Sequence, residues 1–196
     1  MLRKVITGGQ TGVDQAAWRA ALAAGLSTGG AMPRGFRTED GPRPEFAARF
    51  GAVAIASEDV DDRTRANVAA ADATLIFADD RSGPGTLLTV SEARSSGKPM
   101  LVVPPDPGDD PGMPGRIASW LLSQAVRVVN VGGDRESTRP GIGDRVERVL
   151  SAAFLLASGR AVEEPTLDRL APERLRPGHD APRSGEGRRL REGASD

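Results

Sequence analysis

Short apolar runs alternate with amphipathic stretches along most of this chain. The apolar runs are mostly continuous, a pattern typical of parallel strands that are buried on both faces of a sheet. The amphipathic stretches repeat their apolar residues at the spacing of a helix. The last of these stretches has apolar residues at Ile142, Val146, Val149, Leu150, Ala153 and Ala157.

The order of these stretches predicts the fold class. We expect strands at 2–7, 53–56, 74–78, 100–103 and 127–131. We expect helices at 14–24, 44–50, 62–71, 86–96, 114–124 and 142–158. Alternating strands and helices predict an α/β protein with a three-layer Rossmann-like fold and a mainly parallel sheet. The segment 29–44 shows no apolar periodicity, so we predict a loop there, and loops of that length are often functional.

Composition sets the number of domains. A chain of 196 residues, 38% of them hydrophobic, can bury one core but is short for two. Beyond about residue 160 the apolar pattern gives way to prolines, arginines, acids and glycines. We therefore predict a Rossmann-like domain at 1–160 and a disordered tail at 161–196. The lone histidine, His179, lies in this tail without neighbours that would indicate catalysis or a metal.

Several classes of function are disfavoured. The absence of cysteine excludes disulfides, zinc–thiolate sites and thiol catalysis. A formal net charge of -1 and an aromatic content of 4% do not favour nucleic-acid binding. No apolar run reaches the roughly twenty residues that cross a bilayer. We expect a cytoplasmic protein that binds neither nucleic acid nor membrane and has no metal site of its own.

A glycine-rich turn joins the first predicted strand to the first predicted helix. It reads Gly8-Gly9-Gln10-Thr11-Gly12 and is followed by Val13-Asp14. Thr11 and Asp14 have the spacing of a capping box, which would satisfy free N–H groups at the helix start. Glycines let a ligand approach the backbone, and a helix N-terminus favours an anion. The turn therefore predicts a phosphate site, although an ordinary capped turn could have the same residues.

A second glycine turn follows the strand predicted at 74–78 and reads Ser82-Gly83-Pro84-Gly85-Thr86. In a doubly wound sheet, the loops at the carboxyl ends of strands meet where the strand order reverses. We therefore expect both turns to face one bound group. Neither turn has the Gly-Lys-Ser/Thr ending of a Walker A loop.

Several motifs resemble, in the same order, those of the Putative molybdenum carrier family. This family belongs to the SLOG superfamily, as do the LOG phosphoribohydrolases. The resemblance spans about residues 3–155 and implies a Rossmann-like fold whose two Gly/Thr loops bind a phosphorylated ligand. By similarity that ligand is the molybdenum cofactor, carried as cargo, which is a pterin with a phosphate and a metal dithiolene. The motifs are the first turn through Gln15, Gly29-Gly30 with Pro33-Arg34-Gly35, Arg63-Thr64 with Asn67, Gly85-Thr86 with Thr89, and Asn130 to Gly133 with Arg135.

The positions that match the motifs are the ligand-binding residues that the resemblance implies. We expect N–H groups in both turns to receive phosphate oxygens, and Arg63 or Arg135 to pair with the phosphate charge. Without the resemblance, Arg63 would be assigned to a solvated helix face and Asn67 to a local hydrogen bond. The implied residues are Gly8, Gly9, Gln10, Thr11, Gly12 and Asp14 in the first turn, Arg63, Thr64 and Asn67 in the middle helix, Gly83, Gly85, Thr86 and Thr89 in the second turn, and Arg135.

The chain departs from the family pattern at two places. Ala31-Met32 stands where the family often has an aromatic residue, and no tyrosine precedes Arg63. A flat ligand would therefore lack the usual stacking contacts. In the second turn, Pro84 replaces a more usual glycine and removes one N–H donor.

Two other functions remain open. LOG phosphoribohydrolases, which release a base from a nucleoside 5′-monophosphate, have a glutamate where this chain has Thr89, so only Glu92, one turn farther on, could supply that carboxylate. A sensor of a nucleotide-derived ligand would share every feature of a carrier. We therefore favour a non-catalytic protein that binds a phosphorylated small molecule, and homo-oligomerisation is compatible with the superfamily.

Overall fold

The computed structural model describes residues 1–106 and 110–159. The predicted tail at 161–196 lies outside these residues. The described part contains a six-stranded sheet with the strand order β5-β2-β1-β8-β6-β7, in which every neighbouring pair is parallel. Its strands are β1 (Lys4–Ile6), β2 (Ser27–Met32), β5 (Ala52–Ala54), β6 (Ala73–Phe77), β7 (Met100–Val103) and β8 (Val128–Gly133).

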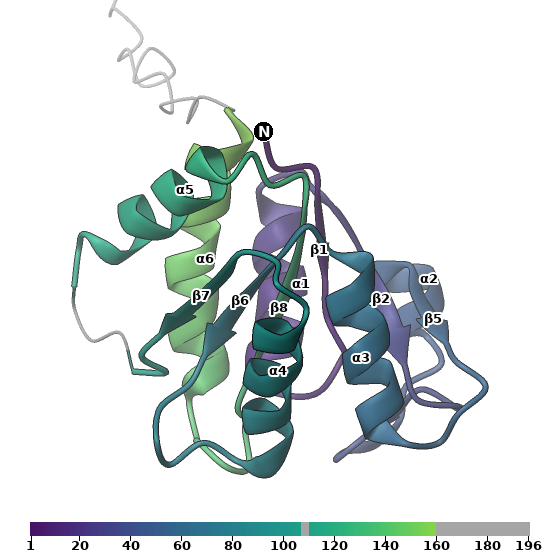
Figure 1. The fold of residues 1–196 in the computed structure, drawn as a ribbon. Helices are drawn as coiled ribbons and strands as arrows, with labels where there is room; N and C mark the ends of the chain where they lie inside the picture. The colour runs from purple at the N-terminus through teal and green to yellow at the C-terminus, as the bar shows by residue number, and fades with distance from the viewer. Residues whose placement is uncertain (107–109, 160–196) are drawn as a thin grey trace, which may run out of the picture. The chain divides into compact units, whose positions relative to one another are not determined.

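Helices cover both faces of this sheet, which confirms the three-layer α/β prediction (Figure 1). On one face, the largest apolar cluster joins the sheet to three helices, α1 (Val13–Ala23), α5 (Met113–Ser123) and α6 (Ile142–Ser158). On the other face lie α3 (Val60–Ala70) and α4 (Pro84–Ser95). A short helix, α2 (Phe46–Phe50), packs against β5.

Alternating side chains of the strands divide between the two faces. Leu75 and Phe77 of β6 belong to the large cluster under α1, α5 and α6, whereas Ile76 packs with Ala93 of α4. The same alternation places Val129 and Val131 of β8 in the large cluster. Both faces of the central strands are therefore buried, as the continuous apolar runs predict.

The strand order reverses at the centre of the sheet. After β1 the chain adds β2 and β5 on one side, and it then builds β6 and β7 on the other side of β8. The loops that leave the carboxyl ends of β1, β6 and β8 therefore meet at one edge, which is where open α/β sheets bind ligands.

The predicted loop at 29–44 is wrong in part, because the structure places β2 and a two-stranded hairpin there. The hairpin consists of β3 (Arg37–Thr38) and β4 (Gly41–Pro42). The apolar pattern does not predict strand β2, because its sequence, STGGAM, is short and rich in small residues. One of these small residues is required by packing, since a Cβ on Gly30 would lie 2.0 Å from the carbonyl oxygen of Thr7.

The predicted capping box is also absent. The residue before α1 is Gly12, and no side chain caps this helix. The Thr11 hydroxyl instead donates to Glu39 in the hairpin turn, and its oxygen accepts the N–H of Glu136 rather than one from the helix start. Within the described ranges, no helix is both long and apolar enough to cross a membrane.

Candidate functional site

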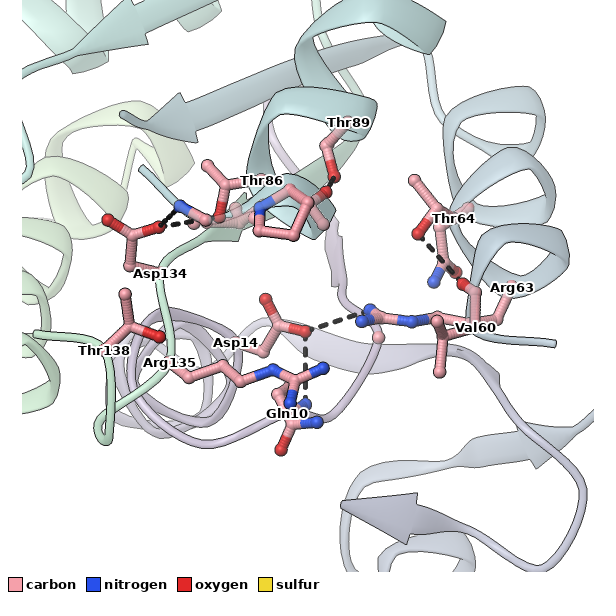
Figure 2. Close-up of a pocket in the computed structure, with 18 of the residues that line it drawn as sticks. Gln10, Asp14, Val60, Arg63, Thr64, Thr86, Thr89, Asp134, Arg135 and Thr138 are labelled. Carbon is pink, nitrogen blue, oxygen red and sulfur yellow. Dashed lines mark hydrogen bonds and ion pairs between the residues drawn. The ribbon is translucent and has the colours of Figure 1, made fainter. Parts of the chain in front are cut away.

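A cavity of about 250 Å³ lies at the edge of the sheet where the strand order reverses. It is bounded by the loop after β1, helices α3 and α4, and the end of β8 with the loop that follows (Figure 2). The structure brings eleven of the residues implied by the resemblance into its lining: Gly8, Gln10, Asp14, Arg63, Thr64, Asn67, Gly83, Gly85, Thr86, Thr89 and Arg135. Gly9, Thr11 and Gly12 do not line it.

The backbone of the first turn donates to the carboxylate of Asp14, at the start of the helix that follows. Asp14, whose side chain is 6% exposed, accepts the N–H of Gln10 at 3.1 Å. Burial raises the pKa of Asp14, and the charge of Arg63 and the N–H groups of Gln10 and Gly8 offset part of that rise. The N–H groups of Gly9 and Thr11 are bonded to side-chain oxygens of the turn itself. Most N–H groups of this turn are therefore already occupied in this structure.

Arg63 lies directly over this turn. Its Nη1 is 3.3 Å from Oδ2 of Asp14, and a Cβ on Gly8 would lie only 1.3 Å from the same nitrogen. Gly8 must therefore be a glycine for Arg63 to reach Asp14. The Nε of Arg63 is buried and has no hydrogen-bond partner in the described structure.

The second turn is organised by Asp134, in the loop after β8. The side chain of Asp134 has no exposed surface. Its two carboxylate oxygens accept hydrogen bonds from Ser82 Oγ at 3.0 Å, Gly83 N at 3.0 Å and Thr86 Oγ1 at 2.9 Å. The Nε of Arg139 lies 3.2 Å from Oδ2 and supplies a positive charge. The Thr86 hydroxyl is therefore already bound to the protein.

One N–H group at the start of α4 remains open to the cavity. Pro84 has no N–H, and the N–H of Thr86 donates to the carbonyl of Gly83. The N–H of Gly85 has no acceptor among the described residues, and Gly85 lines the cavity. An anion at this helix end would also be stabilised by the helix dipole.

Arg135 brings a second cation into the same cavity. Figure 2 shows its side chain extending from the loop after β8 toward Asp14 and Gln10. Within the described part of the chain, its guanidinium forms no hydrogen bond or ion pair; its charge only lowers the pKa of Glu39 from a distance. Arg63 and Arg135 therefore both carry positive charge into the cavity.

Three other residues implied by the resemblance line the cavity but have structural partners. The Asn67 side chain makes two hydrogen bonds with the backbone of Ala31, at 2.7 and 3.0 Å, and so fastens α3 to β2. The hydroxyls of Thr64 and Thr89 each donate to a carbonyl one helical turn earlier. Their oxygens retain lone pairs that can accept from a ligand.

Thr11 and Gly12 line a separate, more open hollow with Glu39 and Ser137. Glu39, at the tip of the hairpin, accepts hydrogen bonds from the hydroxyls of Thr11 and Ser137. Desolvation opposes ionisation of Glu39, but these hydrogen bonds outweigh it and hold the pKa of Glu39 below its ordinary value. The hairpin tip is thus attached to the first turn by an ionised carboxylate.

We expect Glu39→Gln to remove a pH-dependent part of the stability. The lowered pKa of Glu39 means that its contribution is complete above the unfolded-state value of about 4.3 and is lost as the pH falls through the folded-state value. The stability difference between wild type and variant should be at most about 1 kcal/mol near pH 7 and should shrink below about pH 4.

Urea unfolding between pH 3 and pH 7 measures this difference. The matched control is Asp40→Asn, which removes a carboxylate from the same turn that accepts no hydrogen bond from Thr11 or Ser137. An equal pH dependence in both variants would show that the hairpin contacts are not responsible.

Five polar residues of the lining were not among the predicted site residues: Asp61, Asn130, Asp134, Ser137 and Thr138. Asp134 follows the end of β8, and Asp61 lies in the first turn of α3 and lines the cavity. Asn130 also lines the cavity, from the middle of β8. The sequence does indicate Asn130, because a buried amide in a continuous apolar strand needs a hydrogen-bond partner.

The arrangement can hold an anion by charge and by N–H donation. Among the described residues, no group of three or more His, Cys, Asp or Glu side chains could hold a metal ion. Glu92 does not line the cavity, and its Oε1 is paired with Nε of Arg65 at 3.2 Å. The carboxylates that do line it are Asp14, Asp61 and Asp134.

Comparison with known proteins gives the family. Residues 5–154 match the model of the circularly permutated YpsA SLOG family. Among solved structures, the chain is similar to the Putative molybdenum carrier protein from Syntrophus aciditrophicus SB, with 30% sequence identity and a TM-score of 0.69 over 79% of this chain and 95% of that chain. No curated protein matches the chain. Since the family model covers most of its length, this chain belongs to the circularly permutated YpsA SLOG family.

Proposed function

We propose that this protein binds a phosphorylated small molecule in the cavity between the two glycine turns and acts as a carrier rather than as an enzyme. One observation carries the proposal. The unpaired guanidinium of Arg135, the Arg63 guanidinium and the unbonded N–H of Gly85 all border the same cavity. Two cations and a helix N-terminus are the groups with which proteins hold phosphate.

The phosphate position differs from the one that the glycine motifs predict. In the first turn, Asp14 already accepts the N–H of Gln10, so an anion there would face a carboxylate. We therefore place the phosphate between Arg135 and the start of α4. The first turn then positions Arg63 through its pair with Asp14.

The molybdenum cofactor is a candidate cargo because the similar protein from Syntrophus aciditrophicus SB is named a molybdenum carrier. Its phosphate would suit Arg135 and Gly85, and the metal would enter with the ligand. The hydrolase alternative is weakened, since Glu92 is paired with Arg65 outside the cavity.

Mass spectrometry of small molecules released from the purified full-length protein, together with metal analysis, tests the cargo. A bound phosphate ester is the expected result, and a stoichiometric pterin phosphate with molybdenum would identify the cargo. Calorimetric titration with inorganic phosphate tests the site itself, with sodium chloride at equal ionic strength as the control. Absence of both a copurified phosphate ester and any saturable phosphate binding would overturn the proposal.

A further inference from the structure

The floor of the cavity contains an amide without a partner. Asn130 is 3% exposed and lines the cavity, and its side chain makes no hydrogen bond to any described residue. Its amide atoms are not sealed inside the protein. Among the described residues, the sealed side-chain polar atoms that lack a partner are Nε of Arg63 and Nε of Arg145. The Asn130 amide is therefore in contact with the open space of the cavity.

The alternation of β8 explains this position. Val129 and Val131 point into the large core cluster, so Asn130 points to the opposite face, toward α3 and α4. Gly132 lies two residues farther on the same face, and a Cβ there would be 3.4 Å from Cγ2 of Thr89. The missing side chain at Gly132 deepens the cavity beside Asn130.

The Asn130 amide has no partner among the described residues, at a position where an apolar residue would continue the pattern of the strand. A molecule in the cavity that donates to and accepts from the amide would give it the hydrogen bonds that the protein does not supply. Hydroxyl groups do both, because each has one donor and two lone pairs.

A second acceptor lies at the rim. Asp61, in the first turn of α3, lines the cavity and is partly buried. Its N–H bonds to Asp59, but its carboxylate has no hydrogen bond or ion pair within the described residues. A carboxylate without a cation partner suits the hydroxyl groups of a ligand, since an ionised carboxylate only accepts hydrogen bonds.

No aromatic side chain can stack on a ligand in this cavity. The chain has two tryptophans, five phenylalanines and no tyrosine, and none of these seven residues lines the cavity. A flat ring would therefore lack the stacking that proteins usually provide for bases. These residues pack elsewhere: Trp18, Phe36, Phe46 and Phe50 in one cluster, and Phe77, Trp120 and Phe154 in or against the large core.

We propose that the ligand is a phosphorylated sugar, with its phosphate between Arg135 and Gly85 and its hydroxyl groups bonded to Asn130 and Asp61. This inference rests on the proposed function and narrows the ligand class. It favours a hydroxyl-rich molecule over a flat pterin or a ligand held by its base.

Calorimetric titration of the full-length protein with inorganic phosphate, ribose 5-phosphate and AMP tests the inference. One or two hydrogen bonds to the sugar should make ribose 5-phosphate bind about 10-fold or more tightly than inorganic phosphate. AMP should bind within about 10-fold of ribose 5-phosphate, because the cavity offers the base no stacking partner.

Asn130→Leu separates a ligand contact from a structural role. In this variant, the affinity for ribose 5-phosphate should fall to within about twofold of the affinity for inorganic phosphate. The affinity for inorganic phosphate itself should not change. Thermal stability should be unchanged or higher, because an unbonded amide is replaced by an apolar group of similar size. The matched control is Thr74→Val. Thr74 is buried, pairs with Asn130 from β6 and lies outside the cavity. This variant should still bind ribose 5-phosphate more tightly than inorganic phosphate.

Three results would overturn the inference alone: equal affinity for phosphate and ribose 5-phosphate in the wild type, a gain that survives in Asn130→Leu, or AMP binding far more tightly than ribose 5-phosphate. Failure of all three compounds to bind would overturn the inference, and it would overturn the proposed function as well if no phosphate ester copurifies with the protein.

Discussion

Asp134→Ala is expected to lower the free energy of unfolding by about 3–5 kcal/mol, the range observed when one partner of a buried ion pair is removed. The Asp134 carboxylate has no exposed surface and is the shared acceptor for Ser82, Gly83 and Thr86. Without it, these donors lose their shared acceptor in a place that water hardly reaches, and Arg139 keeps only its pair with Asp79. The penalty for unmade hydrogen bonds therefore adds to the loss of one of the two carboxylates that pair with Arg139.

Chemical denaturation followed by circular dichroism measures this loss. Asp134→Asn should lie between the wild type and Asp134→Ala, because an amide retains one accepting oxygen. Asp80→Ala is a suitable control, since Asp80 is exposed in the loop after β6 that also contains Ser82, and it should change stability by less than about 0.5 kcal/mol. A loss below about 1 kcal/mol for Asp134→Ala would contradict the central role assigned to this carboxylate.

Arg135→Gln is expected to weaken phosphate and ribose 5-phosphate binding by about 10- to 100-fold, the value of one hydrogen bond to a charged group. Stability should stay within about 0.5 kcal/mol of the wild type, because the Arg135 guanidinium has no protein partner among the described residues. Calorimetry and thermal denaturation on the same samples measure both quantities.

Arg63→Gln should behave differently, although both arginines border the cavity. It should weaken binding and also destabilise the fold, because Asp14 would keep its buried position without its cation. Arg148→Gln, at an exposed position of α6 outside the cavity, should change neither quantity. If Arg135→Gln bound phosphate like the wild type, the phosphate would have to lie elsewhere.

Regular elements could be predicted well from the sequence where periodicity is strong. The helix at 142–158 and the strand at 100–103 occur in the structure with the predicted bounds. Strand β2 could not be found in the same way, because its glycines are selected by the close approach to Thr7 rather than by any alternating pattern. Tertiary packing, not local propensity, makes this segment a strand.

The candidate site could be located from its motifs, but its donors could not be assigned. The two glycine turns do meet at one cavity, as their placement after strands predicts. Asp14 and Asp134 accept N–H groups of the two turns and so decide which N–H groups remain free. Asp134 lies more than a hundred residues from the first turn in the sequence. Only the folded chain shows that side chains of the protein itself accept most of these N–H groups.

The position of β8 affects when the site can exist during synthesis. Strands β1 and β6 do not pair with each other, and β8 joins them although it is the last strand along the chain. A nascent chain that ends before residue 128 can form two separate sheet fragments, but it has neither the cavity floor nor Arg135. Under the proposed function, ligand binding is therefore limited to chains whose synthesis has passed the final strand, after β8 has joined β1 to β6.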